Sequence, residues 1–355
     1  MGSVLVVNAG STSLKLRAVA ENGEAHDVPS LEQAGKDELD AVAHRVVHGG
    51  PRLRKPVLID EEIRREILAV QPLAPLHNAP ALRAIEEAEE VFPDLPHVAV
   101  FDTAFHETIP EEASVYAIPL RWREEFGVRR YGFHGLSVEW SVERASVLLG
   151  RTELRIVVCH LGGGCSVTAV VDGRSVDTTM GFSPLEGVPM NTRSGSIDPG
   201  AMLYLLRERG VGIDALDHAL NFNSGIEGLG GGSRGSRELE DAAETGDPAA
   251  RLAYAVFEHR VAGAVAAMAA AAGGVDALVF TAGIGEGSER VRAHVCDRLL
   301  FLGVELDAIA NGGEVLDRDI AANDSPVRVL VIHAREELIA ARGARDVLRE
   351  TRNRP

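Results

Sequence analysis

The chain has 355 residues, with 36 Lys or Arg against 53 Asp or Glu, so its formal net charge is −17. At about 150 residues per domain, this length predicts two domains, each large enough for its own core. The acidic balance argues against a nucleic-acid binder, because such proteins need a basic face. An anionic small molecule would therefore have to be held by a local cluster of arginines or backbone N–H groups.

Neither the cysteines nor the apolar segments indicate a secreted or membrane protein. The cysteines, Cys159, Cys165 and Cys296, form no CxxC pair and are odd in number, which makes a poor disulfide framework. The longest apolar run, 261–275, has 15 residues that are mostly Ala and Gly, too few to span a bilayer. It predicts a closely packed core helix, and we expect a cytoplasmic protein with no membrane partner.

In chain order, the predicted elements begin with a unit that occurs twice. A strand, a glycine turn and a returning strand are predicted at 3–7, 10–13 and 14–20, and again at 155–159, 160–164 and 165–171. Asp172-Gly173 then forms a hairpin turn into a third strand at 174–178. One copy in each predicted domain indicates an internal duplication.

The other predicted strands and helices alternate along the chain, which predicts an α/β architecture with helices covering a sheet. Buried strands are predicted at 41–47, 97–101, 276–281 and 327–332. Helical periodicity occurs at 61–70, 80–91, 137–149, 199–209, 236–244, 248–272, 288–301 and 335–351.

Segment 225–235 stands apart because six of its eleven residues are glycine. That composition is too flexible for a regular element. Two interpretations are open: a surface linker, or a loop that lies over a bound nucleotide.

Three glycine turns follow predicted strands and could hold phosphate through oriented backbone N–H groups. They lie at 8–13, 160–164 and 282–287. The third turn has GxGxG spacing, which differs from the GxGxxG of a dinucleotide-binding fold. A Walker loop is also excluded, because the single Gly-Lys pair, Gly35-Lys36, is followed by Asp37 and not by Ser or Thr. A single turn of this kind is usually a tight connection, whereas three in one chain favour phosphate binding.

Four charged or polar residues lie in unusually apolar or compact surroundings: Arg45, Asp102, His134 and Arg193. Structural interpretations exist for each one, namely a core ion pair between Arg45 and Asp102, a core histidine, and a helix-capping loop around Arg193. Together they suggest phosphoryl transfer, which needs spread positive charge, a divalent metal on oxygen ligands and a dry pocket.

Eight ordered segments carry a resemblance to a known family. They are VNAGSTSLK (7–15), HRVVHGG (44–50), LAPLHNAP (73–80), VFDTAFH (100–106), YGFHG (131–135), HLGGG (160–164), MGFSPLEGVPMNTRSGSIDPG (180–200) and FTAGIGEG (280–287). In these segments the chain resembles the acetokinase family of acetate, propionate and butyrate kinases along nearly its whole length.

The resemblance implies a kinase that transfers the γ-phosphoryl group of ATP directly to acetate, reversibly, giving acetyl phosphate and ADP. It implies Mg²⁺, with Mn²⁺ as a substitute, and a homodimer. The implied fold is the duplicated actin-like, ribonuclease-H-like fold of sugar kinases, with two domains and an interdomain active-site cleft. We expect an N-terminal domain of 1–106 plus 338–355 and a nucleotide-binding domain of 107–337.

The family's functional residues map onto this sequence motif by motif. Arg45 and Arg193 would bind the acetate carboxylate and the transferred phosphoryl group, His134 would stabilise its equatorial oxygens, and Asp102 would be the essential acid. Asn8 and Glu336 would hold the metal. The acetate methyl would contact Val47, Leu76, Phe133 and Pro184. The nucleotide would contact Lys15, His160, Leu161, Gly162, Gly163, Gly164, Gly235, Ser236, Arg237, Gly283, Ile284, Gly285, Glu286 and Gly287.

Departures from the family's pattern cluster on the nucleotide side. Gly163 stands where acetate kinases usually have Asn, Gly235-Ser236 replace the usual Asp-Phe, Gly287 replaces another Asn, and Ala334-Arg335 replace Thr-Asn. The hypothesis is that acyl chemistry is retained while base recognition is altered.

Two alternatives to an acetate kinase stay open. One is a paralogue that acts on propionate or another short acid, or that uses a donor other than ATP. The other is a nucleotide-dependent scaffold, which would not need Arg45, Asp102, His134 and Arg193 together.

Overall fold

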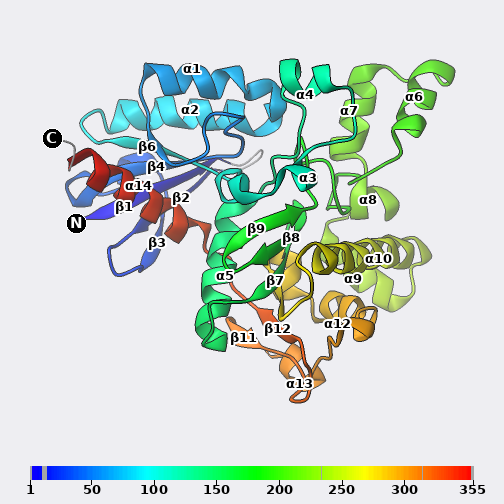
Figure 1. Cartoon of the computed structure of the whole chain (residues 1–355). Helices are drawn as coiled ribbons and strands as arrows, with labels where there is room; N and C mark the ends of the chain where they lie inside the picture. The colour runs from blue at the N-terminus through cyan, green and yellow to red at the C-terminus, as the bar shows by residue number, and fades with distance from the viewer. Residues whose placement is uncertain (1, 10–13, 233, 314, 353–355) are drawn as a thin grey trace. The chain divides into compact units, whose positions relative to one another are not determined.

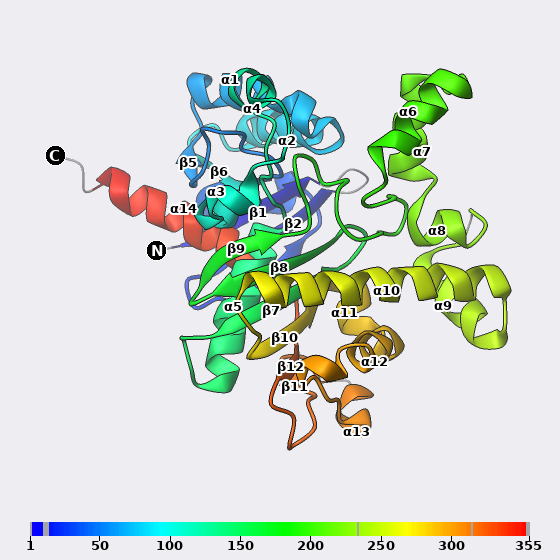
Figure 2. The ribbon, with the colours of Figure 1, turned by 45° about the vertical axis from the view of Figure 1, so that its right-hand side comes forward.

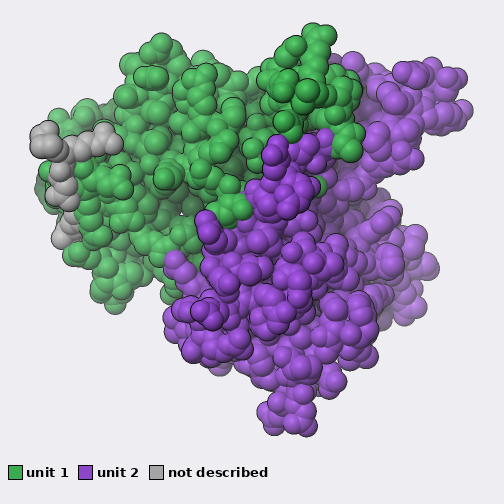
Figure 3. Space-filling model, in the orientation of Figure 1, with its two compact units in different colours: residues 1–108, 117–140, 335–355 green, residues 109–116, 141–334 purple. Residues whose placement is uncertain are grey.

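The computed structural model describes residues 2–9, 14–232, 234–313 and 315–352, apart from the side chains of 75–77. The chain forms two compact units: unit 1 is Met1–Thr108, Ala117–Trp140 and Arg335–Pro355, and unit 2 is Ile109–Tyr116 and Ser141–Ala334 (Figure 3). Residues 117–140 thus pack with the first unit, whereas the predicted domains place them in the second. The domain division at 106/107 and 337/338 stays a prediction.

Unit 1 is built on a six-stranded sheet with the order β3-β2-β1-β4-β6-β5 (Figure 1). Its strands are β1 Ser3–Ala9, β2 Leu14–Val19, β3 Ala25–Val28, β4 Leu39–Val46, β5 Val57–Leu58 and β6 His97–Phe101. β1, β4 and β6 are parallel, while β2, β3 and β5 run antiparallel to their neighbours. The carboxyl ends of the three parallel strands therefore lie at one edge of the sheet.

Unit 2 repeats this topology in a sheet that reads, from its other end, β9-β8-β7-β10-β12-β11. Its strands are β7 Arg155–Leu161, β8 Cys165–Val171, β9 Arg174–Thr178, β10 Ala277–Thr281, β11 Arg318–Asp319 and β12 Arg328–Val331. β7, β10 and β12 are parallel and the others antiparallel. The structure thus confirms the predicted duplication and the actin-like, ribonuclease-H-like α/β fold class.

Helices cover both faces of the first sheet, because successive residues of a strand point to opposite faces. Leu5 and Val7 of β1 pack with Ala88 of α2 (Pro75–Val91), while Val4 and Val6 pack with Ala344 of α14 (Glu336–Arg352). The other helices of unit 1 are α1 Glu61–Ala69, α4 Leu120–Phe126 and the start of α5 Gly135–Leu149, with single 3₁₀ turns at Leu31–Gln33, Lys36–Glu38, Gln71–Leu73 and Ala104–Thr108.

The longest helix of unit 2, α10 (Pro248–Ala271), lies against β7, β8 and β9 (Figure 2). Asp247 caps it by accepting hydrogen bonds from the N–H groups of Ala249 and Ala250. Its buried face is mainly Ala and Val, as expected for a closely packed core helix. No helix in the described part of the chain is long and apolar enough to cross a membrane.

The remaining helices of unit 2 connect the strands or lie outside the sheet. They are α3 Glu111–Ser114, α6 Pro199–Glu208, α7 Ile213–Phe222, α8 Gly225–Leu229, α9 Ser236–Thr245, α11 Ala282–Gly287, α12 Glu289–Asp297, a 3₁₀ turn Leu300–Leu302 and α13 Ala308–Asn311.

Two expectations about glycine-rich segments are wrong. Segment 225–235 contains the helix α8, because tertiary hydrogen bonds from Ile226 and Glu227 to the carbonyls of Met190 and Asn191 offset the entropy of its glycines. The turn expected at 282–287 is a single short helix, α11. The helix expected at 288–301 also ends early, at Asp297.

Candidate functional site

Three of the predicted site residues of unit 1 lie on one face of its sheet, at neighbouring strand ends. Asn8 on β1 pairs in register with Arg45 on β4, and Asp102 directly follows β6. Each comes two residues after a side chain that packs under α14, namely Val6, Ala43 and Val100. Strand alternation therefore brings all three side chains to the α14 face.

Arg45 is the centre of this cluster. Its Nε donates to Oδ1 of Asp102 at 2.8 Å, its Nη2 to Oδ2 at 2.5 Å, and its Nη1 to Oδ1 of Asn8 at 3.0 Å. Oε2 of Glu336, the first residue of α14, lies 3.6 Å from Nη1. Burial by itself would lower the pKa of Arg45, but the charges of Asp102 and Glu336 outweigh burial and raise it. The guanidinium is therefore fixed, in both position and charge.

His134 is held next to Asp102 through the backbone. The N–H of Gly135, which opens α5, donates to the carbonyl of Asp102 at 2.9 Å. A Cβ atom at Gly135 would lie 2.2 Å from that carbonyl oxygen, so only glycine allows the approach. His134 itself has φ 59°, a conformation that is uncommon for a residue with a side chain. The strained backbone and the close approach together fix the position of the His134 backbone, from which the imidazole projects.

The apolar residues predicted for the acetate methyl are only partly described. Val47 and Phe133 are both buried, and the neighbouring His48 ring meets the Phe133 ring edge-on at 5.4 Å. The side chain of Asn78 accepts the N–H of His48 at 3.1 Å and donates to the carbonyl of His48 at 3.0 Å. The side chain of Leu76 lies outside the described residues, as do Gly10, Ser11, Thr12 and Ser13 of the first glycine turn.

Arg193, in unit 2, lies in a loop that α8 secures. Its Nη1 donates to the carbonyl of Pro184 at 3.3 Å, so two predicted site residues of this unit are in contact. Burial lowers the pKa of Arg193 from its ordinary value. The alternative interpretation, a helix-capping loop around Arg193, also holds for this loop, because the carboxylate of Asp198 accepts the N–H of Gly200 at the start of α6.

Two of the predicted nucleotide segments lie side by side in unit 2, at the carboxyl ends of the parallel strands β7 and β10. His160 and Thr281 pair in register there. A Cβ at Gly162 would lie 3.4 Å from the Cβ of Ala282, and one at Gly285 would lie 3.7 Å from the Cβ of Leu161, which are ordinary packing distances. A Cβ placed at Gly163, Gly283 or Gly287 would have no atom of another described residue packed within 4 Å of it. Open backbone at adjoining strand ends is the arrangement that phosphate cradles use.

The other two predicted nucleotide contacts come from β2 of unit 1 and from the start of α9 in unit 2. Lys15 is exposed on β2, opposite Asn8 in register. Gly235, Ser236 and Arg237 open α9, and Gly235 and Arg237 are exposed. A hydrogen bond from the Ser288 hydroxyl to Glu240 ties α9 to the residue that follows α11.

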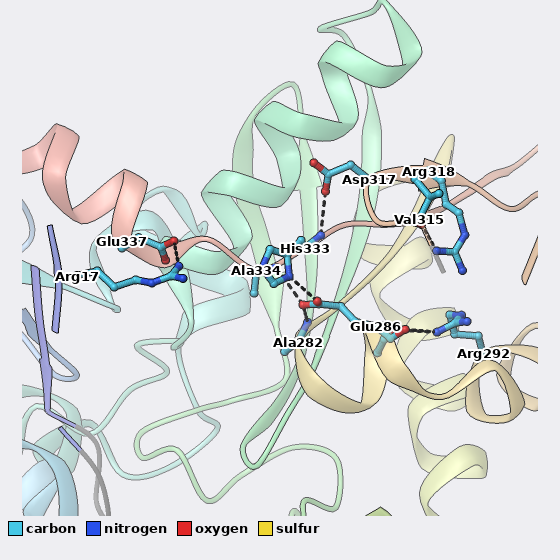
Figure 4. A network of polar contacts seen from close by, with 11 residues as sticks. Arg17, Ala282, Glu286, Arg292, Val315, Asp317, Arg318, His333, Ala334 and Glu337 are labelled. Carbon is cyan, nitrogen blue, oxygen red and sulfur yellow. Dashed lines mark hydrogen bonds and ion pairs between the residues drawn. The ribbon is translucent and has the colours of Figure 1, made fainter. Parts of the chain in front are cut away.

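Glu286, Arg292 and His333 form a hydrogen-bond network around α11 that sequence motifs do not predict. The Glu286 carboxylate accepts hydrogen bonds from the N–H groups of Ala282 and Ala334 at 2.8 and 2.9 Å and contacts Nδ1 of His333 at 2.7 Å (Figure 4). Arg292 is buried, and its Nη1 donates to the carbonyls of Gly285 and Glu286. Arg292 and His333 belong to no motif, and only the fold brings them to α11.

Asn8 and Glu336 offer oxygen ligands of the kind that Mg²⁺ prefers. Oδ1 of Asn8 and Oε2 of Glu336 both approach the same nitrogen, Nη1 of Arg45, so one amide and one carboxylate oxygen converge. Mg²⁺ is commonly held by one or two carboxylates together with substrate phosphates and water. The described residues contain no group of three His, Cys, Asp or Glu that could hold a metal ion.

The duplicated fold, the arginine–carboxylate cluster and the paired glycine segments define a phosphotransferase of the actin-like class, and the comparisons name its family. The acetokinase family model matches residues 24–342, so the chain belongs to the acetokinase family and is a kinase. Curated relatives named acetate kinase include those of Nostoc punctiforme, 46% identical over 88% of this chain and 77% of the relative, and Thermotoga maritima, 41% identical over 97% and 98%.

Solved structures agree with this family. A propionate kinase from Francisella tularensis has a TM-score of 0.90 at 35% identity, covering 97% of this chain and 99% of that one. The acetate kinase of Porphyromonas gingivalis has a TM-score of 0.86 at 34% identity, covering 98% and 100%.

Proposed function

We propose that this chain reversibly transfers the γ-phosphoryl group of ATP to acetate, giving acetyl phosphate and ADP by direct in-line attack of a carboxylate oxygen. Membership of the acetokinase family supports the reaction class. The observation that carries the assignment to these residues is the buried Arg45–Asp102 pair with Asn8 and Glu336 around it.

Arg45 would bind an anionic oxygen through the N–H donors that Asp102 and Asn8 do not use. A guanidinium has five N–H donors, of which Asp102 takes one on Nε and one on Nη2, and Asn8 takes one on Nη1. One hydrogen remains on Nη1 and one on Nη2, and these are the donors available to an oxygen of a carboxylate or phosphoryl group. Arg45 is therefore the residue proposed to hold the acceptor.

Asp102 would act by positioning Arg45 rather than as a general base. Acetate is already ionised near neutral pH, so the attacking oxygen carries no proton that must be removed. Both oxygens of Asp102 accept hydrogen bonds from the guanidinium, so this carboxylate fixes the orientation of Arg45. The role is preorganisation of positive charge where the transferred group develops negative charge.

Arg193 and His134 would stabilise the three equatorial oxygens of the phosphoryl group, since catalysis of this transfer is mostly positioning and charge stabilisation. The backbone groups at 160–164 and 283–287, with Lys15 and residues 235–237, are the proposed nucleotide contacts. Magnesium, with Mn²⁺ as a substitute, would be held by Asn8 and Glu336. When bound, the metal would supply neutralisation of phosphate charge.

Formation of a hydroxamate from acetate, ATP and hydroxylamine tests the proposed reaction. Purified wild-type protein should produce hydroxamate. Arg45→Lys should produce almost none, because lysine lacks the planar fork, and should keep the wild-type circular dichroism, because a positive charge stays beside the buried Asp102 carboxylate. A wild-type protein that binds nucleotide and forms no hydroxamate from any short acid would favour the scaffold alternative. For the metal, Glu336→Gln should weaken Mn²⁺ binding measured by electron paramagnetic resonance, and an unchanged titration would contradict its role as a ligand.

A second candidate is a kinase for propionate or another short acid, or one that uses a different phosphoryl donor. The similarity to a structure titled propionate kinase favours the first variant. Gly163, Gly235 and Ser236, which replace larger residues of the family pattern, favour the second. Because one methylene changes binding by only about 1–3 kcal/mol, the values of kcat/KM for acetate, propionate and butyrate must be compared directly.

The same comparison among ATP, GTP and pyrophosphate decides the donor. A strong preference for ATP with tight binding would contradict altered base recognition. The homodimer and the cytoplasmic location that the resemblance implies stay predictions, and sedimentation equilibrium tests the first of them.

A further inference from the structure

The Glu286 carboxylate joins the carboxyl ends of two neighbouring strands. β10 and β12 are parallel. Ala282, which directly follows β10, and Ala334, which comes three residues after β12, both donate their backbone N–H to the same oxygen, Oε1. His333 contacts the other oxygen, Oε2, through Nδ1, and Figure 4 shows all three partners grouped around the one side chain. Three of the roughly four acceptor sites of a carboxylate are thereby occupied by the protein.

These hydrogen bonds stabilise a backbone that would otherwise be unfavourable. Ala282 has φ 66°, in the left-handed region, which costs a residue with a side chain about 1 kcal/mol or more. The N–H of Ala282 comes directly after Thr281, the last residue of β10 that pairs with a neighbouring strand. A buried amide at this point needs a hydrogen-bond acceptor from outside the sheet. The carboxylate provides that partner from four residues further along the chain.

The other end of the same segment is secured by Arg292. This side chain is 2% exposed, and Nη1 donates to the carbonyls of Gly285 at 3.0 Å and Glu286 at 2.8 Å. Its Nε and Nη2 donate to the side chain and carbonyl of Asn311. Desolvation lowers the pKa of Arg292 to about 10, so the guanidinium is still charged at neutral pH. Residues 282–287 are thus fixed at both ends by buried or half-buried side chains.

We propose that Glu286 is a positioning residue: its carboxylate fixes the backbone of 282–285 against the end of β12, and it does not itself contact the nucleotide. The inference rests on the proposed role of 283–287 in nucleotide binding. It assigns the ligand contacts of this segment to exposed backbone, as at Gly283, which lies between the Ala282 N–H that Glu286 accepts and the Gly285 carbonyl that Arg292 holds. Groups that are ordered before binding lose less entropy when the ligand arrives.

Two substitutions separate positioning from direct contact. Glu286→Gln keeps an oxygen that can accept both backbone N–H groups and an amide nitrogen that can donate to neutral His333, but it removes the negative charge. Glu286→Ala removes every one of these bonds. Glu244→Ala, on an exposed glutamate of α9 in the same unit, is the matched control.

The first measurement is hydrogen exchange of the ligand-free protein. In Glu286→Ala the amides of Ala282 and Ala334 should exchange about tenfold faster or more, because local opening no longer breaks a hydrogen bond. In Glu286→Gln and Glu244→Ala these amides should exchange at nearly the wild-type rate. Unchanged exchange in Glu286→Ala would overturn the proposal. This measurement needs no ligand, so it decides the positioning role even if the wild-type protein binds no nucleotide and the proposed function fails.

The second measurement is the Kd for ADP with Mg²⁺, compared with the Kd for acetate, by calorimetry. Glu286→Ala should weaken ADP binding about tenfold or more and leave acetate binding unchanged, because misplacement of a binding segment has effects of this size. Glu286→Gln should bind ADP nearly as wild type does. Equal losses of ADP affinity in both variants would mean that the charge acts on the ligand directly, which would overturn the proposal.

Discussion

Gly135 donates its backbone N–H to the carbonyl oxygen of Asp102 at 2.9 Å, and this contact joins the start of α5 to the end of β6. The preceding residue, His134, has φ 59°. The proposed imidazole and the proposed carboxylate of unit 1 are therefore linked through two adjoining backbone segments. A shift of either backbone segment would therefore disturb the other.

Gly135→Ala should therefore destabilise the protein and reduce its activity. The new Cβ would lie 2.2 Å from the Asp102 carbonyl, a backbone atom that cannot rotate away, and overpacking of this kind costs roughly 1–3 kcal/mol. Chemical denaturation gives the free energy of unfolding. Gly263→Ala, at an exposed position of α10 with no atom within 4 Å, should instead stabilise by about 0.5–1 kcal/mol. Equal effects of the two substitutions would contradict the close approach at Gly135.

Asp102→Asn should lower both stability and turnover. The carboxylate is 1% exposed and accepts two hydrogen bonds from Arg45, so its neutralisation leaves a mostly buried guanidinium without its main counter-charge. Loss of one partner of a buried pair typically costs about 3–5 kcal/mol, and we expect roughly the lower value because Asn8 and Glu336 remain near Arg45. Thermal unfolding and the hydroxamate assay measure the two effects. A variant with wild-type stability would show that the ion pair contributes little.

Arg193→Ala should reduce kcat/KM with little effect on folding. Its Nη1 donates to the carbonyl of Pro184 at 3.3 Å and to Sδ of Met190 at 3.9 Å, and hydrogen bonds this long are weak. Removal of one donor to the transition state typically costs about 3 kcal/mol, roughly a hundredfold in rate. The control is Arg209→Ala, an exposed arginine at the end of α6, which should keep full activity. If Arg193→Ala unfolds while Arg209→Ala does not, the role of Arg193 is structural.

The protein should lose stability in mild acid, in part through His106. Burial lowers the pKa of this histidine to about 4, although its hydrogen bond to the Phe133 carbonyl opposes the shift. The unfolded chain titrates near 6.5, so between pH 6.5 and 4 the unfolded state binds a proton that the folded state does not. The free energy of unfolding therefore falls as pH decreases, by about 1.4 kcal/mol per pH unit for this group.

Urea denaturation at pH 6.5 and 5.0 measures this effect, with His106→Gln as the comparison, because glutamine keeps a donor for Phe133. The substituted protein should lose about 2 kcal/mol less over this interval than wild type. Burial also lowers the pKa values of His44 and His97, and their contribution is common to both proteins. Identical losses in the two proteins would mean that His106 titrates normally when folded.

The amino-acid sequence by itself determined the duplication, the family and the order of the longer strands, but it did not predict β3, β5, β11, α4 or α7. Alternating apolar residues and glycine turns identified β1, β2, β7, β8 and β9, since strand periodicity and turn chemistry are local properties. The motifs around Arg45, Asp102 and Glu336 were recognisable for the same reason, because each is a short contiguous segment. Local pattern failed where glycine-rich segments form helices, as at α8, since there distant backbone groups supply the stabilising hydrogen bonds.

Only the tertiary structure decided which of these residues touch. Sheet order and register place Asn8 beside Arg45, and the first residue of α14, Glu336, comes from nearly 300 residues further along the chain. Glu286 reads as a ligand contact in its motif, yet the parallel pairing of β10 with β12 surrounds its carboxylate with protein donors. Hydrogen bonding acts over about 3 Å in space and is indifferent to separation along the chain, so such partners are decided by folding alone.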